Sequence, residues 1–198
     1  MRIEATYIPY AIAIGIGATL LMDLWNLFLK RSFSIPSLNL CLLGRWLRHM
    51  PGTFRHSSIA AAPQKRFECM VGLIAHYTIG VVLAFMLVVL TSGDWLARPT
   101  LLVALVYGIG TVVFPFFVLQ PSLGLGFASS RTPRPMQARL KSLATHTVFG
   151  IGLYLCALGV SYMLPVHTTT DTTTERLPRA NARRLDAVAG QTAGRILD

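Results

Sequence analysis

The sequence predicts an all-α fold, an integral membrane bundle of four transmembrane helices. Hydrophobic residues make up 53 % of the 198-residue chain and charged residues only 13 %, well below the roughly 25 % of soluble domains. Four long stretches carry almost no charge, and each has an apolar core of about 20 residues, the length that an α-helix needs to cross the hydrocarbon layer. The basic residues lie in the gaps between these stretches, as is usual in membrane proteins.

The apolar stretches place the four spans at about residues 7–28, 69–90, 100–119 and 143–164. The first span is interrupted by Asp23 and is too long for a cleaved signal peptide. The second and fourth spans contain His76 and His146. The third contains Pro115, which removes a backbone hydrogen bond and therefore predicts a kink.

The two longer gaps between spans are strongly basic. Residues 29–68 carry seven Lys and Arg residues against one acid, Glu68, and residues 120–142 carry four against none. The positive-inside rule therefore predicts that both loops are cytoplasmic and that both termini lie outside the inner (plasma) membrane. The tail, residues 166–198, is Thr-rich and then Arg/Ala-rich without apolar periodicity, which predicts a disordered polar segment.

Each basic loop contains candidate anion contacts. In the first loop Arg45 and Arg48 lie between apolar residues at helical spacing, which predicts a short amphipathic helix in the headgroup layer. Its role is either to anchor the bundle or to recognise an anionic lipid. In the second loop Arg131 and Arg134 lie among prolines. They serve either as positive-inside charge or as contacts to a phosphate-bearing group.

An internal repeat divides the spans into two halves, about 7–90 and 100–164. Three short matches occur in the same order in both halves: residues 15–17 with 108–110, 36–40 with 121–125, and 75–80 with 145–150. Because each half has two spans, both halves enter the membrane with the same orientation. The pattern predicts two parallel helix-loop-helix repeats related by an axis along the membrane normal.

Polar residues inside the spans define a candidate site. Thr19, Asp23 and Asn26 lie on one face of the first span. His76 and His146 are each flanked, four residues away on either side, by small residues that let another helix approach closely. Asp23 and His76 lie about 10 Å from the cytoplasmic edge and His146 about 5 Å. We therefore expect one polar layer in the cytoplasmic half of the bundle.

Three roles for this layer stay open. An Asp–His hydrogen bond can simply hold helices together, or the pair can handle a proton or a substrate, since a lone carboxylate in hydrocarbon protonates or finds a partner. Asp23, His76 and His146 are also a plausible metal ligand set, although no HxxxH or HExxH spacing supports it. No phosphate-binding or dinucleotide motif is present, so no cofactor is expected.

The three cysteines, Cys41, Cys69 and Cys156, form no CxxC pair and are odd in number. We therefore expect small apolar residues without a redox or metal role.

Several motifs resemble a family of bacterial membrane proteins known only as the domain of unknown function 2938 family. They are GIGATLLMDLW at 15–25, GRWL at 44–47, IAHY at 74–77, LQP at 119–121, ASSRTPRP at 128–135, and His146. The resemblance covers about residues 7–164 and implies a small multi-pass membrane protein. It implies no activity, substrate or catalytic residue.

Three functions compete on these observations. The first is a small transporter or permease component that uses the Asp/His site and, with only four helices, forms a homodimer. The second is a non-catalytic scaffold or accessory subunit whose basic loops bind anionic lipid or a partner. The third is an enzyme acting on a lipid-linked substrate, with His146 as acid or base. The first is preferred and an enzyme is not favoured. The net charge of +10 does not indicate nucleic acid, because the basic residues flank the spans; the partner is the lipid bilayer.

Overall fold

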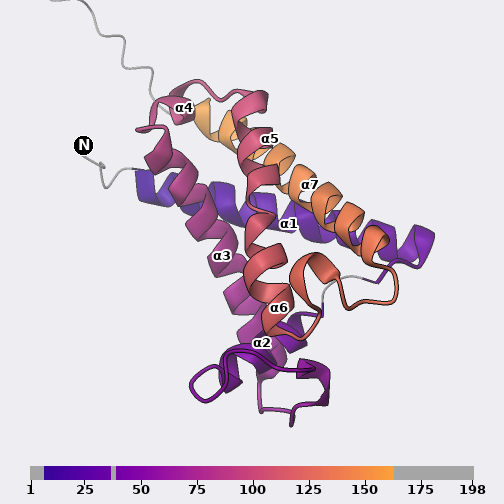
Figure 1. The fold of residues 1–198 in the computed structure, drawn as a ribbon. Coiled ribbons are helices and arrows are strands. Elements are labelled where there is room, and N and C mark those ends of the chain that lie inside the picture. Colours follow the sequence, from indigo (N-terminus) through magenta and orange to yellow (C-terminus); the bar gives the residue numbers. More distant parts are fainter. Residues whose placement is uncertain (1–6, 37–38, 163–198) are drawn as a thin grey trace, which may run out of the picture. The chain divides into compact units, whose positions relative to one another are not determined.

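Helices make up the fold in the part of the chain that the structure describes, residues 7–36 and 39–162 of a computed structural model. This confirms the all-α class. Four helical segments are long and apolar enough to cross a membrane (Figure 1): α1 (Tyr7–Phe33), α3 (Glu68–Leu90), the segment Leu101–Ser122 and α7 (Pro135–Ser161). They overlap the four expected spans. The tail expected to be disordered, residues 166–198, lies outside the described residues.

The third of these segments departs from α-helical geometry. It begins as α5 (Leu101–Gly110), continues from Pro115 to Leu119 as the π-helical segment η2, and ends with α6 (Gln120–Ser122). Proline cannot donate the regular helical hydrogen bond, and such a defect commonly produces a π-bulge or a kink. The departure therefore falls where Pro115 predicts it.

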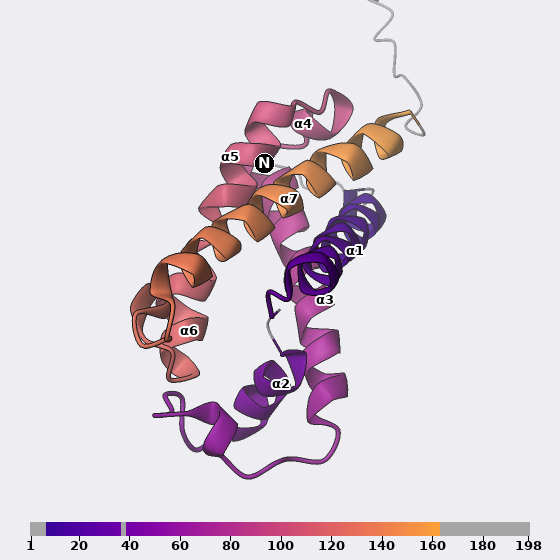
Figure 2. The ribbon, with the colours of Figure 1, turned by 90° about the vertical axis from the view of Figure 1, so that its right-hand side faces the viewer.

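Short elements connect the long helices: α2 (Leu40–His49), η1 (Ile59–Ala61), α4 (Asp94–Ala97) and η3 (Phe127–Ser129). Helix α2 is the expected amphipathic stretch. Its first turn is capped by Asn39, whose side-chain oxygen accepts a hydrogen bond from the Cys41 amide at 2.9 Å, and it packs back against the start of α3 (Figure 2).

Two glycine crossings hold the long helices together in pairs. A Cβ on Gly15 would lie 2.4 Å from the Cα of Val81, so α1 and α3 touch backbone to backbone there. A Cβ on Gly108 would lie 2.5 Å from the Cα of Gly150, which gives the same contact between α5 and α7. Gly15 and Gly108 occupy matching positions in the sequence repeat, so the two halves use the same crossing.

Helix α7 joins the halves, because it packs along both α1 and α5 (Figure 1). Where α1 meets α7, a Cβ on Gly152 would lie 2.8 Å from the Cα of Ala18. The apolar core at this junction consists of fully or nearly fully buried side chains, which include Ile14, Ala18, Leu83, Leu87, Leu96, Phe149, Leu153 and Ala157.

A second, smaller core lies where the two basic loops meet. It consists of Leu43, Trp46, Ile59 and Leu123. Backbone hydrogen bonds from His56 N to Ser122 O at 3.0 Å and from Ile59 N to Leu123 O at 3.1 Å join the loops directly. The end of the bundle that carries most of the positive charge is therefore an ordered structure.

The cysteines differ from the expectation. Cys41 at the start of α2 and Cys69 at the start of α3 form a disulfide, and Cys156 is free. The expectation that none has a redox role is therefore wrong for the first pair. The reason is tertiary: α2 folds back on α3 and brings together two thiols that are 28 residues apart, a separation that carries no local sequence signal.

Adding one methyl group at a crossing should destabilise the bundle. We expect Gly15→Ala and Gly108→Ala each to lower the midpoint of thermal unfolding in detergent, since overpacking of this kind costs about 1–3 kcal/mol. Gly110→Ala is the matched control, because no described atom lies within 4 Å of a Cβ there. An equal loss of stability in all three variants would contradict the crossings.

The disulfide predicts a simple labelling pattern. Protein purified in air without thiol blocking at lysis, and then alkylated in denaturant, should show one alkylated cysteine of the three in the chain, and reduction should expose two more to a second label. Mass spectrometry counts the additions. Three additions before reduction would contradict the disulfide.

Candidate functional site

Asp23 on α1 forms a hydrogen-bonded group with two consecutive residues of α3. Its Oδ1 lies 3.0 Å from Nε2 of His76, and its Oδ2 accepts a hydrogen bond from the Tyr77 hydroxyl at 3.2 Å. The His76 side chain is 15 % exposed and that of Asp23 34 %. The group is therefore partly sheltered between the two helices and open on one side.

The geometry fixes where protons can sit. Tyr77 donates to Asp23, and His76 donates from Nε2 when that nitrogen carries a proton, so both carboxylate oxygens have a donor. Nδ1 of His76 makes no hydrogen bond to another described residue and can accept a second proton. With neutral imidazole and ionised Asp23 the pair carries charge −1, and with imidazolium it carries zero.

The same crossing that joins the helices positions this pair. The Thr19 hydroxyl donates to Gly15 O at 2.7 Å and lies where a Cβ on Gly80 would be. Asp23 follows Thr19 by one helical turn, and His76 precedes Gly80 by one turn. Because α1 and α3 are antiparallel, one turn forward from Thr19 and one turn back from Gly80 bring Asp23 and His76 to the same height along the two helices.

The other predicted polar residue of α1 contacts a different helix. The Asn26 side-chain amide donates to Met22 O at 3.0 Å, and its oxygen lies 3.5 Å from the Thr145 hydroxyl on α7. Thr19 and Asn26 thus lie on the predicted face, but their polar groups are used within α1 or toward α7 and make no hydrogen bond to Asp23 among those in the described chain.

His146 does not join the group around Asp23. Its Nδ1 lies 2.8 Å from the Thr111 hydroxyl, which itself lies 2.6 Å from Gly108 O. One hydroxyl has one proton, so when Thr111 donates to Gly108 it accepts from Nδ1–H of His146, which selects that tautomer. Asp23 and His146 therefore belong to separate hydrogen-bonded groups, one between α1 and α3 and one between α5 and α7.

The three residues considered as metal ligands do not come together in one group. Among residues 7–36 and 39–162, no group of three or more His, Cys, Asp and Glu side chains is placed to hold a metal ion. The ligand set of Asp23, His76 and His146 therefore has two of its members together and the third at another helix pair.

The basic residues predicted to contact anions fall into two groups. Arg45 is 6 % exposed and is paired with Glu68 through two hydrogen bonds, Nε to Oε2 at 2.9 Å and Nη2 to Oε1 at 2.7 Å. These bonds raise the pKa of the Arg45 guanidinium above its ordinary value. Arg48, Arg131 and Arg134 are exposed. Arg45 thus joins α2 to α3, and the other three remain candidate headgroup contacts.

Sequence reasoning missed two contributors, Tyr77 and Glu68. Tyr77 stands next to His76, but its own hydrogen bond to Asp23 can be recognised only when the crossing of α1 and α3 is known. Glu68 is the one acid in a basic loop, and that isolation was a usable signal for a buried ion pair.

The fold defines a helical protein of membrane character, with four helices long and apolar enough to cross a membrane and an acid–histidine pair between two of them. The chain matches the family described as Protein of unknown function (DUF2938) over residues 12–160 and belongs to it. No curated protein and no solved structure matches the chain.

A double-mutant cycle distinguishes two sites from one layer. Asp23→Ala and His76→Ala should be non-additive in unfolding free energy, with a coupling of about 0.5–3 kcal/mol for groups in contact. Asp23→Ala and His146→Ala should be additive within about 0.5 kcal/mol. Coupling of similar size in both cycles, measured by chemical unfolding in detergent, would restore the single layer.

Proposed function

We propose that this protein is a small transporter or permease component of the bacterial inner membrane whose Asp23–His76 pair binds a proton. The observation that supports the proposal is the pairing of an acid with a histidine inside a segment apolar enough to span the bilayer. Ionisable residues in such segments are costly and mark ion or substrate pathways by default.

The charge of the pair suggests the class of substrate. Without a proton on Nδ1 the group carries charge −1 in a medium that disfavours net charge. A proton or a cationic substrate removes that cost, and the two would compete for the same carboxylate. We therefore propose proton-linked movement of a cation or of a cationic organic molecule.

We also propose the orientation that charge distribution favours, with residues 29–68 and 120–142 in the cytoplasm. The cytosol keeps most thiols reduced, so the Cys41–Cys69 pair would then be a dithiol under ordinary conditions and a disulfide after oxidation. Blocking the thiols at lysis, before exposure to air, should therefore give three additions if these loops are cytoplasmic, and one addition would count against this orientation.

A homodimer remains part of the proposal, but its contact surface changes. The small residues expected to serve a dimer, Gly15, Gly80 and Gly150, are used within one chain. Gly159 is an exposed glycine with open space around it, and it is a position where a second copy could approach closely.

The alternative function is a non-catalytic scaffold or accessory subunit. It is favoured by the hydrogen bonds of Thr19, Asn26 and His146, which are all made within one helix or between two helices. In that case the Asp23–His76 bond would be one more such contact, and no ligand or proton would move through it.

Reconstituted vesicles test the proposal. A potassium diffusion potential should drive proton entry into vesicles containing the protein faster than into protein-free vesicles, as a trapped pH dye reports. His76→Ala should abolish this flux because the Nδ1 proton site is gone, while His146→Ala, the matched intramembrane control, should retain it.

Two outcomes would contradict the proposal. One is a wild-type flux equal to that of protein-free vesicles, with and without candidate cations. The other is an equal flux in wild type and His76→Ala when both proteins insert and remain folded. Either result, accompanied by a loss of thermal stability in His76→Ala, supports the scaffold.

A further inference from the structure

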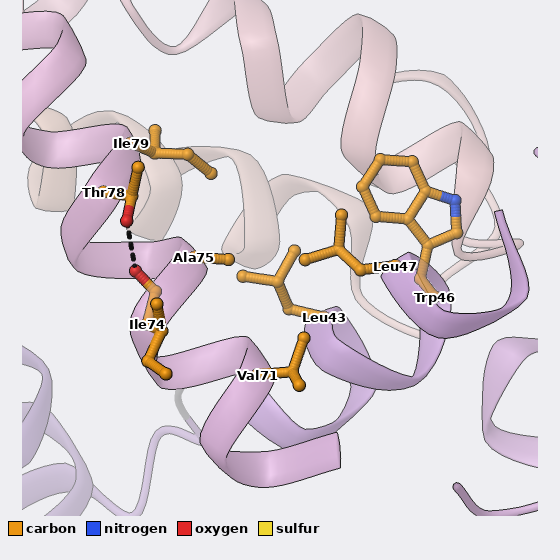
Figure 3. Close-up of a pocket in the computed structure, with 8 residues that line it drawn as sticks. All are labelled: Leu43, Trp46, Leu47, Val71, Ile74, Ala75, Thr78 and Ile79. Carbon is orange, nitrogen blue, oxygen red and sulfur yellow. Dashed lines mark hydrogen bonds between the residues drawn. The ribbon is translucent and has the colours of Figure 1, made fainter. Parts of the chain in front are cut away.

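An apolar groove runs between α2 and α3, apart from the Asp23–His76 pair (Figure 3). It encloses about 370 Å³. Side chains from both helices line it, among them Leu43, Trp46 and Leu47 from α2 and Val71, Ala75 and Ile79 from α3. Val71 and Ile79 are eight residues apart, so this wall extends about 12 Å along a membrane-spanning helix.

The groove presents hydrocarbon to an occupant. Two of its lining residues have polar side-chain atoms, and both make hydrogen bonds elsewhere. The Thr78 hydroxyl donates to Ile74 O at 2.8 Å within the helix, and Nε1 of Trp46 donates to Phe54 O at 2.8 Å. An occupant therefore needs no hydrogen-bonding group inside the groove, which fits an acyl chain.

Positive charge lies at one end of the groove. Lys65 and Arg66 are exposed and immediately precede α3, about one to two turns before Val71. The described segment 39–68 carries five Lys and Arg residues and one acid, Glu68, which gives a net charge of +4. Because Glu68 is paired with Arg45, the side chains of Lys65 and Arg66 have no acidic partner within that segment, and exposed cations of this kind attract lipid phosphate.

We propose that the α2–α3 groove binds one anionic phospholipid, with an acyl chain between the helices and its phosphate at Lys65 and Arg66. This site goes beyond the proton site and does not depend on it. A second copy of the chain fits less well, because it would bring its own positively charged segment to the same place. A zwitterionic lipid would leave the excess positive charge unmatched.

Native mass spectrometry of the full chain in mild detergent tests the site. The protein is loaded with phosphatidylglycerol or with phosphatidylcholine of the same acyl chains, and retained lipid is counted. We expect one phosphatidylglycerol to be retained in preference to phosphatidylcholine. Soluble glycerol phosphate, offered as a competitor, should not displace it, because it lacks the acyl chain.

Two kinds of variant distinguish binding of the acyl chain from binding of the headgroup. Ala75→Phe fills the groove and should abolish retention, whereas Val82→Phe, at a half-exposed position of α3 outside the lining, should not. The double variant Lys65→Ser/Arg66→Ser should weaken retention of phosphatidylglycerol about 25-fold, since each juxtamembrane cation contributes about a factor of five. Lys30→Ser/Arg31→Ser removes the same charge from two exposed positions at the end of α1 and should leave retention unchanged.

The outcomes are decisive in both directions. Loss of retention in Ala75→Phe with an unchanged unfolding temperature supports the groove. If that variant fails to fold, the Lys65→Ser/Arg66→Ser protein carries the test, because both side chains are exposed. Equal retention of the two lipids, equal retention in both charge variants, or a dimer mass that disappears in Ala75→Phe would overturn the proposal.

Discussion

The backbone contact between α1 and α3 at Gly15 and Gly80 is the constraint on which the site depends. Close approach is possible because neither residue has a side chain to keep the helices apart. In lipid, helices gain little from burying apolar surface against one another, so packing of this kind supplies much of the association energy. Once the two helices touch there, the step of one turn on each helix brings Asp23 to His76. A different crossing point would leave the carboxylate without a partner in the hydrocarbon region.

The second half of the chain uses the same glycine crossing but lacks the acidic residue of the first half. Gly108 meets Gly150, and one turn before Gly150 lies His146, the counterpart of His76. By the sequence repeat, however, Phe116 stands where the first half has Asp23. His146 instead meets Thr111, a neutral hydroxyl. Two related helix pairs thus carry one histidine each, but only one pair carries an acid. This asymmetry is the physical reason to look for proton binding at α1 and α3.

The sequence predicted those parts that depend on residues within one helix. Span lengths, the break at Pro115, and the shared face of Thr19, Asp23 and Asn26 all follow from helix geometry and composition. The hydrogen-bond partners of Asp23 and His146 did not follow from the sequence, because depth in the membrane says how far along a helix a residue lies but not which neighbour it faces.

Contacts made by the loops were harder to foresee for a related reason. The Cys41–Cys69 disulfide and the Arg45–Glu68 ion pair both require α2 to fold back on α3. Amphipathicity predicted that α2 lies at the membrane surface without specifying the helix against which it rests.

Helix α2 is held rigidly against the start of α3. Gly44 lies against Glu68 and Gly72 so closely that a Cβ would be inside the α3 backbone. Arg45 closes the same contact with an ion pair and with hydrogen bonds to Ala60 O and Ala62 O at 3.0 and 3.1 Å. These bonds neutralise the one acid of the loop and keep the cation of Arg45 away from the surface. What remains exposed there is positive and lies beside an apolar groove. An amphipathic helix pinned in this way has a fixed exposed surface, which a loosely attached helix would not have.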